Sequence, residues 1–211
     1  MPQLQPRVAR ENWLRRPLSI TWMIGGVSGS PVIEDWLGES SGAIGSVGLG
    51  WDFDEYWGAE TRFSYSSMGL YDSPRAIQSA PYPETDPQRG SPTADRSGEF
   101  LIWDVRALYY PWGDTPWRLY GFVGLGVTHL TYDDRLRQGY DTELFTLPFG
   151  VGLKYHWTDW MAWRVELADN LALGGNGVET LHHFSYTGGV EIRLGGARKS
   201  YWPWNPARNY W

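Results

Sequence analysis

The residues of this chain that could perform nucleophilic chemistry lie in the tripeptide His183-Phe184-Ser185. Positions two apart on an extended strand project from the same face, so the imidazole and the hydroxyl would lie together, as general-base activation of a serine requires. Glu191 follows with the same parity. This spacing supports one alternative, a hydrolase with a serine nucleophile. H-x-S is an unspecific motif, however, and the parity shared with Glu191 would turn both groups to the charged face, away from the apolar one. We therefore expect no enzymatic activity.

The histidines do not form a metal-binding pattern. His182 and His183 are adjacent, so on a strand they would point to opposite faces. His129 and His156 fall in separate segments without an obvious carboxylate partner, and the chain has no cysteine. The glycine-rich residues 173–177 do not connect a strand to a helix, as a phosphate-binding loop would. We expect no metal and no cofactor.

Ten charged residues alternate with apolar residues along the chain, and we expect them to share one face. They are Asp52, Glu60, Arg62, Asp104, Arg106, Lys154, Arg164, Glu166, Glu191 and Arg193. Buried charges must pair, and five acids facing five bases would make a neutral, salt-bridged interior. Two alternatives stay open: a small-solute pore gated by exchange of partners, and a proton or ion relay.

The segment that must position Lys154, Arg164 and Glu166 is residues 147–171. Its sequence, LPFGVGLKYHWTDWMAWRVELADNL, consists of two alternating runs joined by a short turn. One face of each run is aromatic and aliphatic, and the other carries glycines and charges. A period of two predicts strand–turn–strand.

The same alternation predicts eight strands in the whole chain. We expect them at residues 18–27, 42–53, 57–66, 100–110 and 118–132, two within 147–171, and one at 181–194. Long connections (28–40, 70–97, 133–141 and 172–179) alternate with short ones. This alternation is typical of outer-membrane barrels, which have short periplasmic turns and longer outer loops.

Composition favours the same class. The chain has 211 residues, a net charge of −6 and a mean hydropathy of −0.44, with 26 glycines, 14 tryptophans and 13 tyrosines. The sequence has no stretch of 18 consecutive apolar residues, so it predicts no membrane-spanning helix. The acidic balance does not suggest a nucleic-acid partner. A polar average with many aromatics fits strands that face lipid on one side only.

Tryptophans concentrate at one end of the expected hairpins. Those at the short turns are Trp51, Trp57, Trp112, Trp117, Trp157, Trp160 and Trp163, and an even number of strands would bring Trp13, Trp202, Trp204 and Trp211 to the same end. Indole rings are enriched at the membrane interface, so this predicts a periplasmic aromatic girdle in contact with outer-membrane lipid. Tryptophans that filled a soluble core would not cluster in this way.

Three patterns carry a resemblance to a known family: YGFVGLGVTHL at 120–130, FGVGLKYHWTDWMAWRVELAD at 149–169 and TGGVEIRLG at 187–195. Together they resemble the OmpA-like eight-stranded outer-membrane β-barrel superfamily. The resemblance implies an all-β fold, an eight-stranded antiparallel up-and-down transmembrane β-barrel, in an outer membrane of Gram-negative type. It covers roughly residues 18–194. Lipid A deacylases are eight-stranded barrels as well, so the resemblance implies a lipid A-modifying hydrolase, with His183 and Ser185, as an alternative function. A soluble lipocalin-like barrel with the opposite facing is the alternative fold.

We therefore expect an N-terminal periplasmic arm (1–17), a barrel (18–194) and a Trp-rich periplasmic tail (195–211). The arm should be extended and poorly ordered unless a partner holds it. Residues 18–27 alternate like a strand, so we expect the signal peptide to be absent from this chain. The expected function is structural, and one form of it is a subunit of a larger envelope complex that docks through Trp202, Trp204 and Trp211. Two alternatives for the tail stay open: it lies along the membrane interface, or it is disordered.

Overall fold

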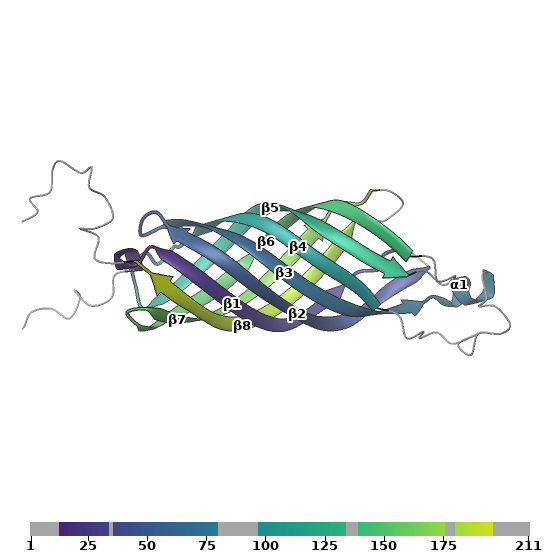
Figure 1. Cartoon of the computed structure of the whole chain (residues 1–211), viewed down its shortest axis with the longest axis horizontal. Helices are drawn as coiled ribbons and strands as arrows, with labels where there is room; N and C mark the ends of the chain where they lie inside the picture. Colours follow the sequence, from purple (N-terminus) through teal and green to yellow (C-terminus); the bar gives the residue numbers. More distant parts are fainter. Residues whose placement is uncertain (1–12, 34–35, 80–96, 134–138, 176–179, 196–211) are drawn as a thin grey trace, which may run out of the picture.

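The computed structural model describes residues 13–33, 36–79, 97–133, 139–175 and 180–195. Each strand pairs antiparallel with its neighbours in sequence, and β1 pairs with β8 to close the barrel (Figure 1). The strands are β1 (Leu18–Gly29), β2 (Leu37–Asp52), β3 (Trp57–Asp72), β4 (Ser97–Tyr109), β5 (Trp117–Asp133), β6 (Gly139–Thr158), β7 (Met161–Ala172) and β8 (Leu181–Leu194). The predicted eight-stranded up-and-down barrel is confirmed.

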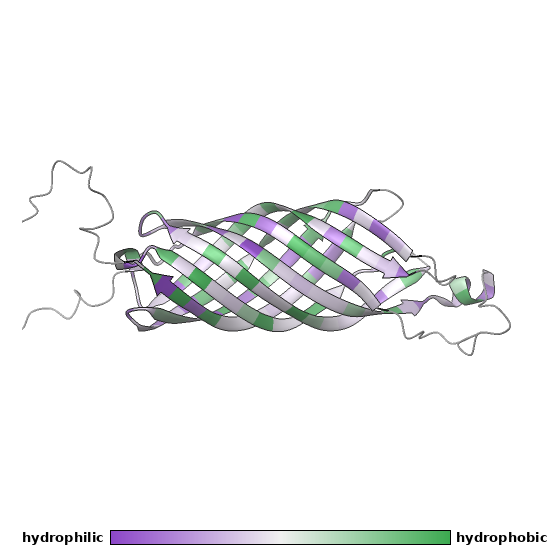
Figure 2. Ribbon diagram, in the orientation of Figure 1, coloured by the Kyte–Doolittle hydropathy of each residue, from purple (hydrophilic) through white to green (hydrophobic). Residues whose placement is uncertain are grey.

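The apolar face of the strands points outward. Val123 and Leu125 are each 61% exposed, whereas Lys154 and Glu166 inside the barrel are 2% and 3% exposed. Hydrophobic and hydrophilic residues alternate along the ribbons as this facing requires (Figure 2). A lipocalin-like barrel needs the opposite facing, so that alternative is wrong.

The two ends of the barrel differ. The short turns lie at the end where β1 begins and β8 ends, and the short helix α1 (Pro74–Ser79) lies at the other end (Figure 1). In the turn after β2, one carboxylate oxygen of Asp54 accepts the backbone N–H groups of Tyr56 and Trp57 at 2.7 and 2.8 Å. Within the described ranges, no helix is long and apolar enough to cross a membrane.

Several strands continue into segments that we expected to be loops. β2 begins at Leu37 rather than 42, β3 runs to Asp72, and β6 begins at Gly139. The reason is that the two faces exchange character near the long-loop end. On β5, Val127 is followed on the outer face by His129, while Leu130 is buried inside. The alternation persists, but its apolar half changes sides.

This exchange limits the lipid-compatible part of the wall. From Trp117 to Val127 the outer face of β5 is apolar. Ten steps of about 3.3 Å at a tilt of about 40° give a height of about 25 Å, the height of the apolar band of an outer-membrane barrel. The remainder of the strand extends beyond that band.

An apolar cluster, here called the apolar cap, fills the interior at the long-loop end. Its buried members are Val27, Val32, Leu37, Ile44, Met68, Leu70, Phe100, Leu130, Tyr132, Leu144, Ala172 and Leu181. Since the outside of this part is polar, burial of these side chains is driven by the hydrophobic effect, as in a soluble barrel.

Candidate functional site: a charged lumen

Four strands each carry an acid and a base two residues apart on the inward face. The pairs are Glu60 with Arg62 on β3, Asp104 with Arg106 on β4, Arg164 with Glu166 on β7, and Glu191 with Arg193 on β8. Their ion pairs measure 2.5, 2.5, 2.8 and 2.6 Å. Because residues i and i+2 share a face of a strand, each pair can form within one strand. This spacing is the sequence signal for the site.

Glu166 is the centre of the network. It receives the guanidinium groups of Arg62, Arg106 and Arg164 at 2.5, 2.9 and 2.8 Å. The hydroxyl of Tyr120 donates to the same carboxylate at 2.7 Å. The three arginines come from β3, β4 and β7, so one carboxylate joins opposite walls of the barrel.

Two residues link this centre to the short-turn end. Arg164 also donates to Glu60, and its guanidinium lies 3.7 Å from the carboxylate of Glu191. Lys154 Nζ lies 2.7 Å from the same Glu191 oxygen. All ten predicted residues are therefore brought into one lumen, each no more than 5% exposed.

An eleventh charge, Arg118, was missed by the sequence analysis. Its guanidinium lies 2.8 Å from Asp52, which also receives Arg193 at 2.7 Å and the Tyr110 hydroxyl at 2.8 Å. Arg118 is fully buried. It has the inward parity of Tyr120 on β5, which could have identified it. We call the eleven residues the charge network; with six cations and five carboxylates, the expectation of equal numbers is wrong.

The N-terminal segment closes the short-turn end of the lumen. Trp13 opens a 3-10 helix, η2 (Trp13–Arg15), and is only 1% exposed. Its indole N–H donates to the carbonyl of Thr115 at 2.7 Å, and its carbonyl accepts from Arg193 at 2.9 Å. The guanidiniums of Arg118 and Arg193 lie 5.4 and 4.7 Å from its ring.

This contradicts two expectations. Trp13 is not part of an outward girdle, and the end of the arm is held inside the barrel rather than extended. The physical reason is cation–π attraction and backbone hydrogen bonding at the mouth of the lumen, neither of which leaves a periodic signal in sequence. The structure does not describe residues 1–12, so the boundaries of the expected arm stay a prediction.

The residues that suggested a hydrolase do not contact each other as a catalytic pair. His183 and Ser185 are buried on the inward face, as their parity predicts. His183 Nε2 lies 3.3 Å from Glu39, whereas the Ser185 hydroxyl donates to the carbonyl of Ala168 at 3.5 Å.

Two other histidines have carboxylate neighbours on the outer wall, whereas the ring of His156 lies 4.7 Å from that of Trp13. His182 lies 2.9 Å from Asp169, and His129, for which we saw no partner in the sequence, lies 3.2 Å from Asp141. Across the part of the chain that is described, no group of three or more His, Asp or Glu residues is arranged to hold a metal ion.

The seven tryptophans expected at the short turns are all exposed, by 47–58%. They are Trp51, Trp57, Trp112, Trp117, Trp157, Trp160 and Trp163. Trp202, Trp204 and Trp211 lie outside the described residues.

The model of one protein family, the outer membrane protein β-barrel domain, matches residues 8–190. The chain belongs to this family. Its apolar outer wall is therefore the face that an outer-membrane β-barrel turns to lipid, and an outer membrane is its location.

Solved structures of other outer-membrane barrels share the fold at low identity. Neisserial surface protein A is 12% identical with a TM-score of 0.59, covering 84% of this chain and 97% of that one. OprG from Pseudomonas aeruginosa is also 12% identical with a TM-score of 0.59, covering 89% and 98%. A search of curated proteins found no match.

Proposed function

We propose that this outer-membrane β-barrel is a non-conducting structural barrel without enzymatic activity. The observation that carries the proposal is the succession of three fillings along the lumen: the η2 segment, the charge network and the apolar cap. Each would have to move before a solute could pass.

The middle filling is the most costly to open. Separating one partner from a buried ion pair costs about 3–5 kcal/mol, and Glu166 alone pairs with three arginines. An ion crossing the apolar cap would in addition pass hydrocarbon side chains that cannot replace its hydration. Both costs oppose steady conduction and favour a barrel whose interior fixes its shape.

Planar-bilayer recording tests the proposal. We expect no conductance steps from the full chain, nor from the Arg106→Ala and Glu60→Ala variants, because the apolar cap is unchanged in both. Steady conductance of the unmodified chain that these substitutions alter would establish the small-solute pore in place of the structural barrel. The hydrolase alternative is tested separately, since it predicts altered lipid A after expression of the chain.

The structural role that we propose includes docking at the periplasmic side. The η2 segment and the end of β8 lie at the same mouth of the barrel (Figure 1). The exposed tryptophans of the short turns belong to this end too. The polypeptide therefore enters and leaves the barrel at the same mouth. We propose that Trp202, Trp204 and Trp211 provide contacts to an envelope protein there.

Truncation after Gly195 tests the docking role. We expect the full chain, extracted in mild detergent, to migrate on a native gel as part of a larger assembly, and the truncated chain to migrate as the barrel alone. Retained heat-modifiable mobility would show that the truncated barrel is folded. If both forms migrate as the barrel alone, the docking role is refuted, while the structural barrel is not.

A further inference from the structure

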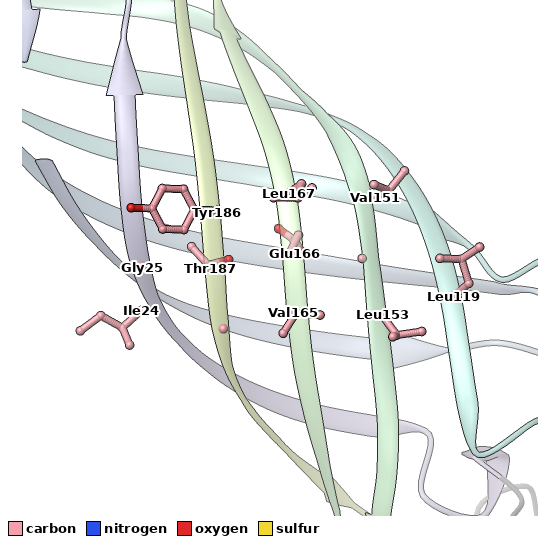
Figure 3. A pocket seen from close by; sticks show the side chains of 12 residues that line it. Ile24, Gly25, Leu119, Val151, Leu153, Val165, Glu166, Leu167, Tyr186 and Thr187 are labelled. Atoms are coloured by element: carbon pink, nitrogen blue, oxygen red, sulfur yellow. The ribbon is translucent and has the colours of Figure 1, made fainter. Parts of the chain in front are cut away.

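An apolar groove of about 630 Å³ crosses the outer wall of the barrel. It lies over five neighbouring strands, from Leu119 on β5 through β6, β7 and β8 to Ile24 on β1 (Figure 3). Glu166 also borders the groove, but its carboxylate faces the lumen, where it is bound by arginines. The side chains that form the outer rim are hydrocarbon, apart from the phenol of Tyr186.

The groove exists because one position on the outer wall has no side chain. Leu119, Leu153, Val165, Gly188 and Ile24 are successive neighbours across the strands. Four of them project aliphatic groups, and Gly188 projects none. A Cβ at Gly188 would meet nothing closer than 3.9 Å, so the space above this residue is open.

The aromatic ring on the same strand does not fill that space. Tyr186 is the next outward residue on β8 and is 61% exposed. Its ring lies against Gly26 of β1, where any side chain would collide with it. The ring therefore forms a wall of the groove (Figure 3). The floor at Gly188 stays uncovered.

We propose that this groove binds one acyl chain of a membrane lipid. The groove is continuous with the lipid-facing wall, and no charged group projects into it. An apolar protein surface gains no hydrophobic free energy in lipid, so a lipid is retained there only by closer van der Waals packing. A groove contacts an acyl chain on several sides, whereas a flat wall contacts it on one side only.

The length of the groove agrees with that of one acyl chain from one leaflet of the bilayer. Five strands span four interstrand spacings, about 19 Å in total. Half of the hydrocarbon core of a bilayer is about 15 Å thick, which sets the reach of one acyl chain. An α-helix is about 10 Å wide with its side chains, so a floor one residue wide suits a chain better than a helix.

Photolabelling in vesicles tests the proposal. The full chain is reconstituted in phosphatidylethanolamine doped with the same lipid carrying a diazirine on one acyl chain, and labelled positions are mapped by peptide mass spectrometry. We expect labels to concentrate on outward residues of β7 and β8. Gly188→Leu fills the floor of the groove and should reduce this labelling by at least about fivefold, which corresponds to about 1 kcal/mol of binding.

The matched control is Ala107→Leu, which adds the same side chain to the exposed outer face of β4, away from the groove. It should leave the labelling of β7 and β8 unchanged. If Gly188→Leu does not give a heat-modifiable folded barrel, Gly188→Ala supplies a smaller filling, and the labelling pattern of the unmodified chain still tests the idea. Labels spread evenly around the barrel, or unaffected by filling the groove, would overturn it. So would a dimer of the chain that Gly188→Leu dissociates, because the groove would then bind a second copy.

Discussion

Replacing Glu166 by glutamine tests whether the charge network stabilises the barrel. Glutamine has nearly the same shape but no charge, and its amide nitrogen can only donate. In the folded barrel it would face three guanidinium groups and the Tyr120 hydroxyl, all of which are donors. Each of the three buried arginines would lose one of its charged partners, keeping Glu60 or Asp104.

The expected loss of stability follows from these contacts. Hydrogen bonds to charged groups contribute about 1.5–3 kcal/mol each, and removing one partner of a buried ion pair costs about 3–5 kcal/mol. Glu60, Asp104 and Glu191 still balance part of the arginine charge. We therefore expect Glu166→Gln to lower the free energy of unfolding by about 3–5 kcal/mol, and not by the sum of every contact.

Urea unfolding in lipid vesicles, followed by tryptophan fluorescence, measures this change. The matched control is Glu143→Gln, an identical chemical change on the exposed outer face of β6. The control should shift the free energy of unfolding by no more than about 0.5 kcal/mol. Adding Arg62→Met to Glu166→Gln removes one of the unbalanced cations, so the double variant should be more stable than the sum of the two single losses predicts.

Equal stability of the Glu166 and Glu143 variants would refute the reasoning. It would mean that water or a rearranged partner compensates for the lost carboxylate, and that charge pairing in the network does not stabilise the barrel. Additive losses in the double variant would refute the narrower statement that Arg62 and Glu166 depend on one another.

Three further perturbations test other parts of the barrel by the same measurement. Trp13→Ala should lower the free energy of unfolding by about 3–5 kcal/mol, because it removes a buried ring; a loss under 1 kcal/mol would mean that η2 does not stabilise the mouth. Gly152→Ala should lower the free energy of unfolding by about 1–3 kcal/mol, because its Cβ would collide with the ring of Tyr120, whose hydroxyl donates to Glu166. Gly121→Ala is the control and should be tolerated, since its Cβ would have 3.9 Å of room. Equal losses in the two variants would contradict this packing. Val123→Lys should cost about 2–4 kcal/mol and His129→Lys about 0–1 kcal/mol, because the first lies in the lipid band and the second at its edge.

The fold could be predicted from the sequence because successive side chains of a strand point to alternate faces of the sheet. Lys154 and Glu166 alternate with residues such as Val165, so a one-residue slip would put charges into lipid. The same parity assigns all ten predicted charges to the lumen. The contacts among them could not be predicted, since Glu166 binds arginines from three strands and only the closed barrel brings these together.

Two parts of the interior escaped prediction for different reasons. The arm was judged by composition, and nothing in residues 13–16 indicates that Trp13 would lie between Arg118 and Arg193. Part of the apolar cap, including Leu37 and Leu70, was assigned to loops because apolar residues there move to the inward face. The pattern still has a period of two, but it no longer matches the outward-apolar template of the preceding segments.

That exchange of faces reflects a change of solvent along each strand. Where the outside is lipid, turning apolar side chains inward gains no hydrophobic free energy, because they are already out of water on the outer face. The lumen can therefore hold charges whose pairing fixes the shape of the barrel. Where the outside is water, the hydrophobic effect is available again, and Leu130 and Leu144 turn inward while His129 and Glu143 turn outward. The outer edge of the bilayer should therefore lie between Val127 and His129 on β5 and between Phe145 and Glu143 on β6. Since Val127 pairs with Phe145 and His129 with Glu143, both strands place the edge at the same level of the sheet.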